Sequence, residues 1–260
     1  MSAMVRRRLA PSLAMARRSV RGIIRQPQLW APSVVFPLFF GAVSSAAFDR
    51  TRSIPGFPEV DSFLTFILPA TIIQGVMFGA TSVGNEMAID MENGFADRLR
   101  AAPVGRTGLL LGRLAGVMSL AVVQVIAFVG IFAVFGASVA GGLGAIVALV
   151  VMGSLLSGAI GSFALIVALR TGSVEAVNGS FPIFFAAVFM SSAFFPPELS
   201  GGWFETVARL NPVSWLVDAS RDLVIDGFTV SAAATAVGLA AAGMAIVTAE
   251  AVRTLLGGGK

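Results

Sequence analysis

The sequence predicts an all-α, polytopic membrane protein with six transmembrane helices in a single transmembrane domain, residues 1–260. Of the 260 residues, 56% are hydrophobic and only 12% are charged, and the mean hydropathy is +0.88, whereas soluble domains carry about a quarter charged residues. The apolar residues also fall in long blocks, each of which can cross a ~30 Å hydrocarbon layer as a helix. These blocks predict spans at about 29–48, 63–84, 114–135, 141–169, 179–195 and 230–249.

The segment before the first predicted span, residues 1–28, has the pattern of an amphipathic helix. Leu9, Leu13, Ala16 and Val20 recur at helical spacing, and arginines occupy mostly the other face. A basic amphipathic helix of this kind lies in the membrane interface. We expect it on the cytoplasmic side, either as a plain anchor that sets the topology or as a docking element.

The connection between the second and third predicted spans combines an apolar stripe with charged residues. Met87, Met91, Phe95 and Leu99 recur every four residues, which predicts a short cytoplasmic helix at about 86–102, ended by Pro103. The charged residues of this helix are Glu86, Asp90, Glu92, Asp97, Arg98 and Arg100. Periodicity alone leaves two interpretations open: a solvated loop helix, or a helix that presents its charges to a cytoplasmic partner.

In the predicted spans and directly beside them strongly polar side chains are few; Gln74, Gln124 and Asn178 are among them. Because buried ionisable residues mark proton and ion relays in membranes, their scarcity argues against a proton-coupled carrier. The fifth predicted span is rich in phenylalanine, which suggests a path for an apolar substrate. The candidate path residues are Gln74, Phe181, Phe185 and Phe189. Ordinary packing or lipid contact is the alternative explanation for these rings.

Residues 196–229, between the last two predicted spans, form an outer region with its own helical signal. Leu216 and Leu223 are apolar at helical spacing, and Trp215 belongs to a residue type enriched at membrane interfaces. The pattern predicts a helix that lies at the outer leaflet or dips into it, with simple anchoring as the alternative. Asp218 and Arg221 lie one turn apart, so we expect a local ion pair, of small energy where exposed.

The distribution of basic residues predicts the orientation of the chain. With six spans, 14 of the 18 Lys and Arg residues fall on the side that carries both termini. Because Lys and Arg accumulate in cytoplasmic loops, we expect both termini in the cytoplasm. The pI of 11.1 does not indicate nucleic-acid binding, because the arginines flank membrane spans and no nucleic-acid motif accompanies them.

Several residue types needed for catalysis are missing from the sequence. It contains no Cys, His or Tyr, which removes imidazole bases, Ser-His and Cys-His pairs and nearly every zinc site. No G-x-x-x-x-G-K-[ST] phosphate loop occurs, and the only lysine is Lys260. We therefore expect no catalytic residue, metal or cofactor on this chain. An intramembrane enzyme would need Ser-Lys or aspartyl chemistry, for which no residues are suitably placed.

The inner connection and the outer region together resemble the membrane subunits of ABC-2 type exporters, in particular the daunorubicin-resistance permease group. The inner match comprises Glu86, the run 92–103 and Gly112-Arg113. The outer match comprises Asn211-Pro212, Trp215 and the stretch 218–221. Length, six spans, the N-terminal helix and the cytoplasmic termini agree as well, so the resemblance covers essentially the whole chain.

The resemblance implies roles for both matching segments. The helix at 86–102 would be the coupling helix, whose charged residues named above dock onto a separate ATP-hydrolysing subunit. Residues 210–223 would belong to re-entrant outer helices that cap the translocation path, with an outer gate region at Asn211, Trp215, Asp218 and Arg221. ATP and Mg would bind to two such ATPase subunits, and a second copy of this permease or a related permease would complete the transporter.

The resemblance also implies a substrate class and a location. It implies export of a hydrophobic or amphipathic molecule, drug or lipid, across the plasma membrane of a bacterium, with membrane lipid as a further partner and no nucleic acid. Two alternatives stay open: a carrier or channel that works without ATP, and export of a polysaccharide or glycolipid by the same type of complex.

Overall fold

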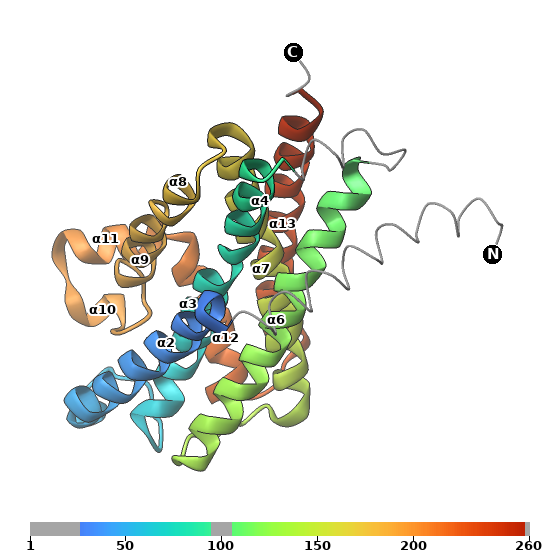
Figure 1. Ribbon diagram of the computed structural model, residues 1–260. Helices are drawn as coiled ribbons and strands as arrows, with labels where there is room; N and C mark the ends of the chain where they lie inside the picture. Colours follow the sequence, from blue (N-terminus) through green and yellow to red (C-terminus); the bar gives the residue numbers. More distant parts are fainter. Residues whose placement is uncertain (1–26, 95–105, 258–260) are drawn as a thin grey trace.

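The computed structural model describes residues 27–94 and 106–257 (Figure 1). The described part is helical and contains no strand. Its elements are, in chain order, α2 (Pro27–Phe48), the 3₁₀ helix η1 (Asp49–Ser53), α3 (Phe63–Ala80), α4 (Ser82–Glu92), α6 (Arg106–Val134), α7 (Gly142–Thr171), α8 (Val174–Asn178), α9 (Phe181–Phe189), α10 (Pro197–Ser200), α11 (Gly202–Leu210), α12 (Pro212–Ile225) and α13 (Val230–Gly257).

The predicted all-α, polytopic architecture is confirmed. Five helical segments of the described chain are long and apolar enough to cross a membrane: Trp30–Ser53, Phe63–Glu92, Thr107–Val134, Gly142–Thr171 and Val230–Gly257. Several predicted boundaries were wrong. The third span was predicted to begin at residue 114, but α6 begins at Arg106, and the last span was predicted to end at residue 249, but α13 continues to Gly257. Both helices extend past the hydrocarbon layer into polar sequence.

The predicted continuous span at 179–195 was also wrong. In its place the structure has two short helices, α8 and α9, separated at Gly179 and Ser180. Pro182 lies in the first turn of α9, where its missing N–H and fixed φ favour the start of a new helix over the continuation of α8. The broken apolar segment Val174–Phe189 takes the place of the predicted fifth crossing and is shorter than the five candidate spans; we call it the broken crossing.

Helix α3 is the centre of the molecule. Every residue of α3 except Leu64 is buried, and the helix is packed by α2, α6, α7, α9 and α12. A helix that is apolar all round is typical of such a central position. Close approach to α6 depends on Gly75, where an added Cβ would lie 2.4 Å from Cε2 of Phe128.

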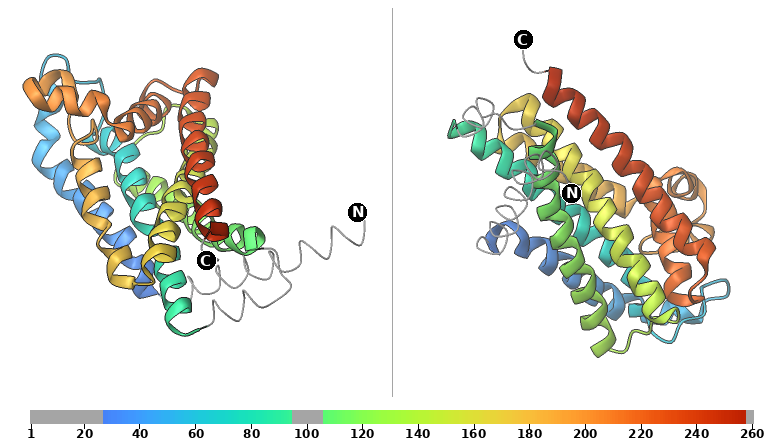
Figure 2. Two further views of the ribbon diagram at one scale, coloured as in Figure 1. Left: turned by 90° about the horizontal axis from the view of Figure 1, so that it is seen from above. Right: turned by 90° about the vertical axis from the view of Figure 1, so that its right-hand side faces the viewer.

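Helices α2 and α13 form the periphery on opposite sides of the molecule, with α3 and α7 between them (Figure 2). In the segment that contains α2, only 22% of an apolar 18-residue stretch is buried inside the protein, and in α13 only 17%. In the segment that begins with α3, 94% of such a stretch is buried. Both peripheral helices expose large apolar side chains such as Phe39 and Ile246. Their outward faces are therefore suited to lipid or to another membrane subunit.

The inner connection differs from the predicted separate helix at 86–102. Helix α4 starts at Ser82, directly after the turn at Thr81, and ends at Glu92. Glu86, Asp90 and Glu92 therefore belong to the extended second crossing. The rest of the predicted coupling helix, including Asp97, Arg98 and Arg100, lies outside the described residues, as does nearly all of the predicted N-terminal helix at 1–28.

The chain alternates between two ends of the molecule. In Figure 1 the end of α4, helix α8 and the end of α13 lie at the top, whereas the loop that follows η1 and the end of α6 lie at the bottom. We call the top the inner end and the bottom the outer end, following the predicted orientation. Helices α10, α11 and α12 all belong to the connection that leads from the broken crossing to α13.

Candidate functional site

The irregular segment after α9, residues 190–196, is held by α12. Its backbone groups need partners inside the protein because lipid offers none. The Ser192 N–H donates to Ser214 Oγ at 3.0 Å. The Asn211 amide donates to the carbonyl oxygens of Ala187 (2.7 Å) and Met190 (3.0 Å). The outer helix α12 thus supplies the partners that α9 loses where it ends.

Arg221 lies at the centre of this junction. Its guanidinium donates to the carbonyl oxygens of Ser192 (2.9 Å) and Ala193 (3.4 Å) and to Asp218 Oδ1 (3.0 Å). Its Cζ lies 3.9 Å from the centroid of the Phe66 ring of α3. Arg221 therefore joins α12, α3 and the segment after α9 through one buried cation.

The charges of this junction follow from its surroundings. Burial lowers the pKa of Arg221 to about 10, with Asp218 acting in the opposite direction, so the guanidinium remains charged at neutral pH. Partial burial raises the pKa of Asp218, while the hydrogen bond from Ser192 Oγ (2.6 Å) and the charge of Arg221 lower it. The predicted Asp218–Arg221 pair exists, but its cation is buried, so removing one partner should cost more than at a surface pair.

The other two outer residues have different roles. Asn211 is the N-cap of α12, where its Oδ1 accepts a hydrogen bond from the Val213 N–H at 2.9 Å. The half-exposed Trp215 donates from Nε1 to the Arg209 carbonyl oxygen at 2.9 Å, which satisfies an acceptor at the end of α11. All four predicted outer residues therefore fix how α11, α12 and the end of α9 pack together.

At the inner end, a buried ion pair joins α4 to α6. The guanidinium of Arg113 donates to Asp90 Oδ2, and both residues are buried. Ionisable residues inside a membrane bundle are costly and pair with one another, and this pair connects the end of α4 to the start of α6. The geometry therefore does not favour the prediction that Asp90 contacts a partner subunit, because its carboxylate already pairs with Arg113 of the same chain.

Glu92 is the predicted coupling residue that the described surface presents most openly. It is exposed at the C-terminal end of α4, whereas Glu86 is half-buried one and a half turns earlier. Asp97, Arg98 and Arg100 belong to residues 95–105, outside the described chain.

The three predicted phenylalanines of α9 form a continuous series of rings. The centroids of Phe181 and Phe185 lie 6.2 Å apart, and those of Phe185 and Phe189 lie 4.3 Å apart. Phe78 of α3 adds a contact to Phe181 at 4.4 Å, and Phe40 of α2 adds one to Phe189 at 5.5 Å. The series therefore lies where α2, α3 and α9 meet.

A cavity of about 290 Å³ lies at the inner end of this ring series. It is bordered by α2, by the α3–α4 junction and by the start of α9. Gln74, the fourth predicted path residue, does not line this cavity. It is buried on α3, and its Nε2 has no hydrogen-bond partner within the described chain.

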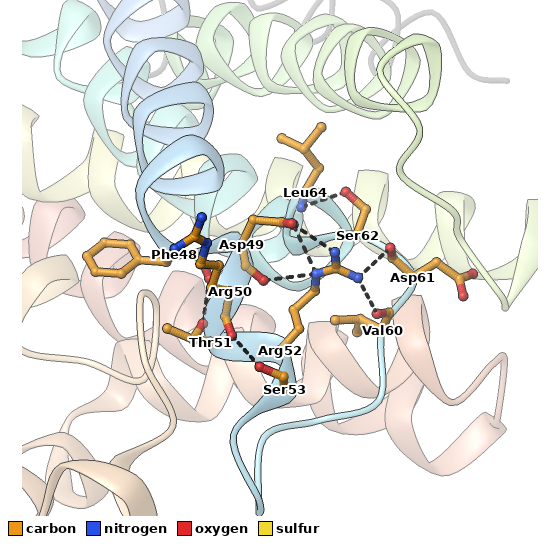
Figure 3. A network of polar contacts seen from close by, with 10 residues as sticks. All are labelled: Phe48, Asp49, Arg50, Thr51, Arg52, Ser53, Val60, Asp61, Ser62 and Leu64. Atoms are coloured by element: carbon orange, nitrogen blue, oxygen red, sulfur yellow. Dashed lines mark hydrogen bonds and ion pairs between the residues drawn. The ribbon is translucent and has the colours of Figure 1, made fainter.

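The outer loop between η1 and α3 is fastened by Arg52 (Figure 3). Its guanidinium donates to the carbonyl oxygen of Asp61 (2.7 Å) and to Asp49 Oδ2 (2.9 Å). These bonds connect the end of the first crossing to the start of the second. They close a polar loop and add no group that reaches the ring series.

Sequence reasoning missed two pairs that the structure assembles. Arg113 was noted as a family motif residue without a role, although a lone arginine inside an apolar block indicates a buried partner. Asn178 was noted as polar, but its contact with Asn85 joins residues 93 positions apart, which no local pattern reveals. Within the described residues, no group of three or more His, Cys, Asp or Glu side chains is placed to hold a metal ion.

Comparison with known proteins places this helical arrangement in a family. The family model described as ABC-2 type transporter matches residues 12–225, which is most of the chain. The chain belongs to the ABC-2 type transporter family. This ABC-2 protein is therefore a multi-pass membrane protein of the permease type, and the resemblance seen in its motifs is confirmed.

Named relatives agree with this assignment. The ABC-2 chain is 28% identical over 196 residues to the daunorubicin resistance ABC transporter permease protein DrrB1 of Streptomyces coeruleorubidus, covering 74% of this chain and 66% of that protein. It is 26% identical over 216 residues to ycf38 of Pyropia yezoensis, a protein named as a transport permease, covering 81% and 72% of the two chains. The matched part thus spans about two thirds of the length of these relatives.

Proposed function

We propose that this chain is the permease subunit of an ATP-driven exporter of hydrophobic or amphipathic molecules in a bacterial plasma membrane. The observation that carries the proposal is its membership of the ABC-2 family over residues 12–225. Two ATP-hydrolysing subunits would bind at the inner end, and ATP and Mg would bind to them. A second permease, either identical or related, would complete the pathway.

The connection between α4 and α6 supports a coupling role for the inner end. Helix α4 follows α3 after a single turn residue, and the Asp90–Arg113 pair fastens it to the start of α6. A displacement at the end of α4 would therefore move the central helix α3 and the third crossing together. Such rigid connections let a partner switch a bundle between two packed arrangements that differ by a few kcal/mol.

The ring series supports a hydrophobic or amphipathic substrate. Phe181, Phe185 and Phe189 follow one face of α9, and Phe78 extends this apolar surface onto the central helix. Aromatic rings bind flat apolar molecules through stacked and edge contacts. A polysaccharide would instead need a path with many hydrogen-bonding groups. The daunorubicin-resistance relative fits the same class by its name.

A charge reversal at the inner end tests the proposal. Glu92→Arg, combined with Asp97→Arg and Arg98→Asp, should abolish ATP-driven transport and co-purification of the ATPase subunit while the chain still inserts into the membrane. Glu59→Arg, an exposed change in the outer loop, is the matched control and should retain both properties. Transport by proteoliposomes that contain this chain alone would contradict the proposal and favour an ATP-independent carrier or channel.

A further inference from the structure

The cavity at the inner end of the ring series has a polar wall that contains Asn85 and Asn178. We propose that this cavity binds an uncharged amphipathic molecule, whose hydroxyl or amide group is held by Asn85 and Asn178 and whose apolar body rests on Phe78 and Phe181. The inference rests on the proposed function in naming a substrate class. The binding site itself can be tested without any ATPase subunit.

The two asparagines form an incomplete hydrogen-bonding pair. Asn85 Nδ2 donates to Asn178 Oδ1 at 3.0 Å, from α4 to the end of α8. Two facing amides are able to exchange two hydrogen bonds, but these exchange one, and the buried Asn85 Oδ1 has no partner among the described residues. A buried acceptor without a partner is unfavourable. A ligand hydroxyl or amide that enters between the two side chains, donating to Asn85 Oδ1 and accepting from Asn178 Nδ2, would complete the pair.

The remaining polar groups of the cavity are already satisfied. Thr81 Oγ1 donates to the Phe78 carbonyl oxygen at 2.8 Å. Ser33 Oγ donates to the Trp30 carbonyl oxygen at 2.6 Å and accepts from Gln124 Nε2 at 2.8 Å. Recognition of a polar group therefore falls to the two amides.

The lining also restricts the charge of the ligand. None of the described residues that line the cavity is charged. A charged head group would lose its hydration without gaining a counter-ion, which is strongly unfavourable in a low-dielectric site. The described lining therefore favours a neutral head group.

The apolar wall fits the other end of the ligand. The Phe78 and Phe181 rings have centroids 4.4 Å apart, and Phe36 of α2 contributes a half-exposed ring on the same cavity. The volume of about 290 Å³ is at the lower end of the range for ligand pockets. It accommodates the polar end of a molecule, and a longer apolar body can continue along Phe185 and Phe189.

Two probes that differ in one hydroxyl group test this assignment. The full chain in lipid nanodiscs would be titrated against 9-anthracenemethanol and 9-methylanthracene, and the dissociation constants would be measured by fluorescence anisotropy after subtraction of empty nanodiscs. Asn85→Leu and Asn178→Leu should each weaken binding of the alcohol about tenfold and leave binding of the hydrocarbon unchanged. Thr81→Val, in the same cavity, is the control and should change neither probe.

The outcomes separate the possibilities. Unchanged binding of the alcohol in both asparagine variants would overturn the assignment, and so would equal weakening of both probes, because the amides would then act only in packing. Displacement of the alcohol by dioctanoylglycerol supports the site with a lipid as its natural ligand. Lack of displacement, with the tenfold effect retained, supports a non-lipid amphipath.

The result is independent of the test of the proposed function. If the ATPase subunit fails to co-purify, the exporter hypothesis fails while selective binding of the alcohol still stands. If the asparagine variants leave the alcohol affinity unchanged but transport remains ATP-driven, the site fails and the exporter stands.

Discussion

At the residue scale, Arg221 compensates for helical hydrogen bonds that α9 does not make. Its guanidinium satisfies the carbonyl oxygens of Ser192 and Ala193 in the buried segment that follows the helix. It also balances the half-exposed Asp218 and covers the Phe66 ring. A neutral side chain at this position would leave several acceptors without a donor in a place that water reaches poorly.

We therefore expect Arg221→Ala to lower the free energy of unfolding by about 3 kcal/mol. The change would be measured by thermal or denaturant unfolding of the purified chain in detergent. Arg209→Ala is the control, because Arg209 is exposed and pairs with Glu205 on the surface of α11; its effect should stay within about 1 kcal/mol. Equal effects of the two changes would show that Arg221 has no special role in the junction.

The Asp90–Arg113 pair predicts strong coupling between two residues. Asp90→Leu leaves a buried guanidinium without its partner, and Arg113→Leu leaves a buried carboxylate, so each change should cost about 3–5 kcal/mol. The double change Asp90→Leu/Arg113→Leu removes both charges and should cost much less than the sum of the two. Unfolding measurements on the four proteins of this cycle give the coupling energy.

An exposed pair between two other helices provides the comparison for that cycle. Arg170 and Glu250 join α7 to α13 at 3.3 Å with both side chains largely exposed. The same cycle on this pair should give a coupling energy below about 1 kcal/mol. Additive effects at Asp90 and Arg113 would contradict the assigned ion pair.

At the element scale, the packing of α3 against α2 and α6 depends on the absence of a side chain at Gly75. An added Cβ there would lie 2.4 Å from the Phe128 ring and 3.0 Å from the Ser33 carbonyl oxygen. Pro37 in α2 has no N–H to offer that carbonyl group, and Gln124 of α6 approaches it at 3.4 Å. Three helices thus meet at one point.

We expect Gly75→Ala to destabilise the protein by about 1–3 kcal/mol, measured by thermal unfolding in detergent. Phe128→Leu in the same chain should restore part of the loss, because it shortens the side chain that the new methyl group contacts. Gly130→Ala in α6 is the control, because no described residue lies within 4 Å of a Cβ at that position; it should be neutral or stabilising by about 0.5–1 kcal/mol. A similar loss at both glycines would contradict the packing contact assigned to Gly75, because Gly→Ala by itself favours the helix.

The elements also show how far sequence reasoning reaches. The long apolar blocks predicted α2, α3, α6, α7 and α13, because hydrocarbon thickness sets their length and composition directly. The broken fifth crossing was missed although Gly179 and Pro182 are visible in the sequence, since its apolar composition outweighed those two signals. The partners of Asp90 and Asn85 could not be predicted, because both contacts depend on how distant helices pack.

At the scale of the whole molecule, the two least buried helices lie on opposite sides of the central helix. The outward face of α2 continues the apolar surface formed by the α9 rings through Phe40, whereas α13 packs mainly on α7 and α12. We therefore expect a second permease to pair through the side that carries α2 and α9, which places two ring series opposite each other. The outward face of α13 would then contact lipid.

The orientation of the whole bundle can be measured directly because the sequence has no cysteine. Single changes Glu59→Cys and Thr229→Cys mark the outer end, and Glu92→Cys and Arg253→Cys mark the inner end; all four positions are exposed. In intact cells a membrane-impermeant maleimide should label the first two, because basic residues keep the opposite end in the cytoplasm. The latter two should become labelled only after the membrane is opened. Labelling of one residue from each end in intact cells would mean that the broken crossing at Val174–Phe189 does not traverse the bilayer. It would then contradict the expectation that Glu92 and Arg253 lie on the same, cytoplasmic side of the membrane.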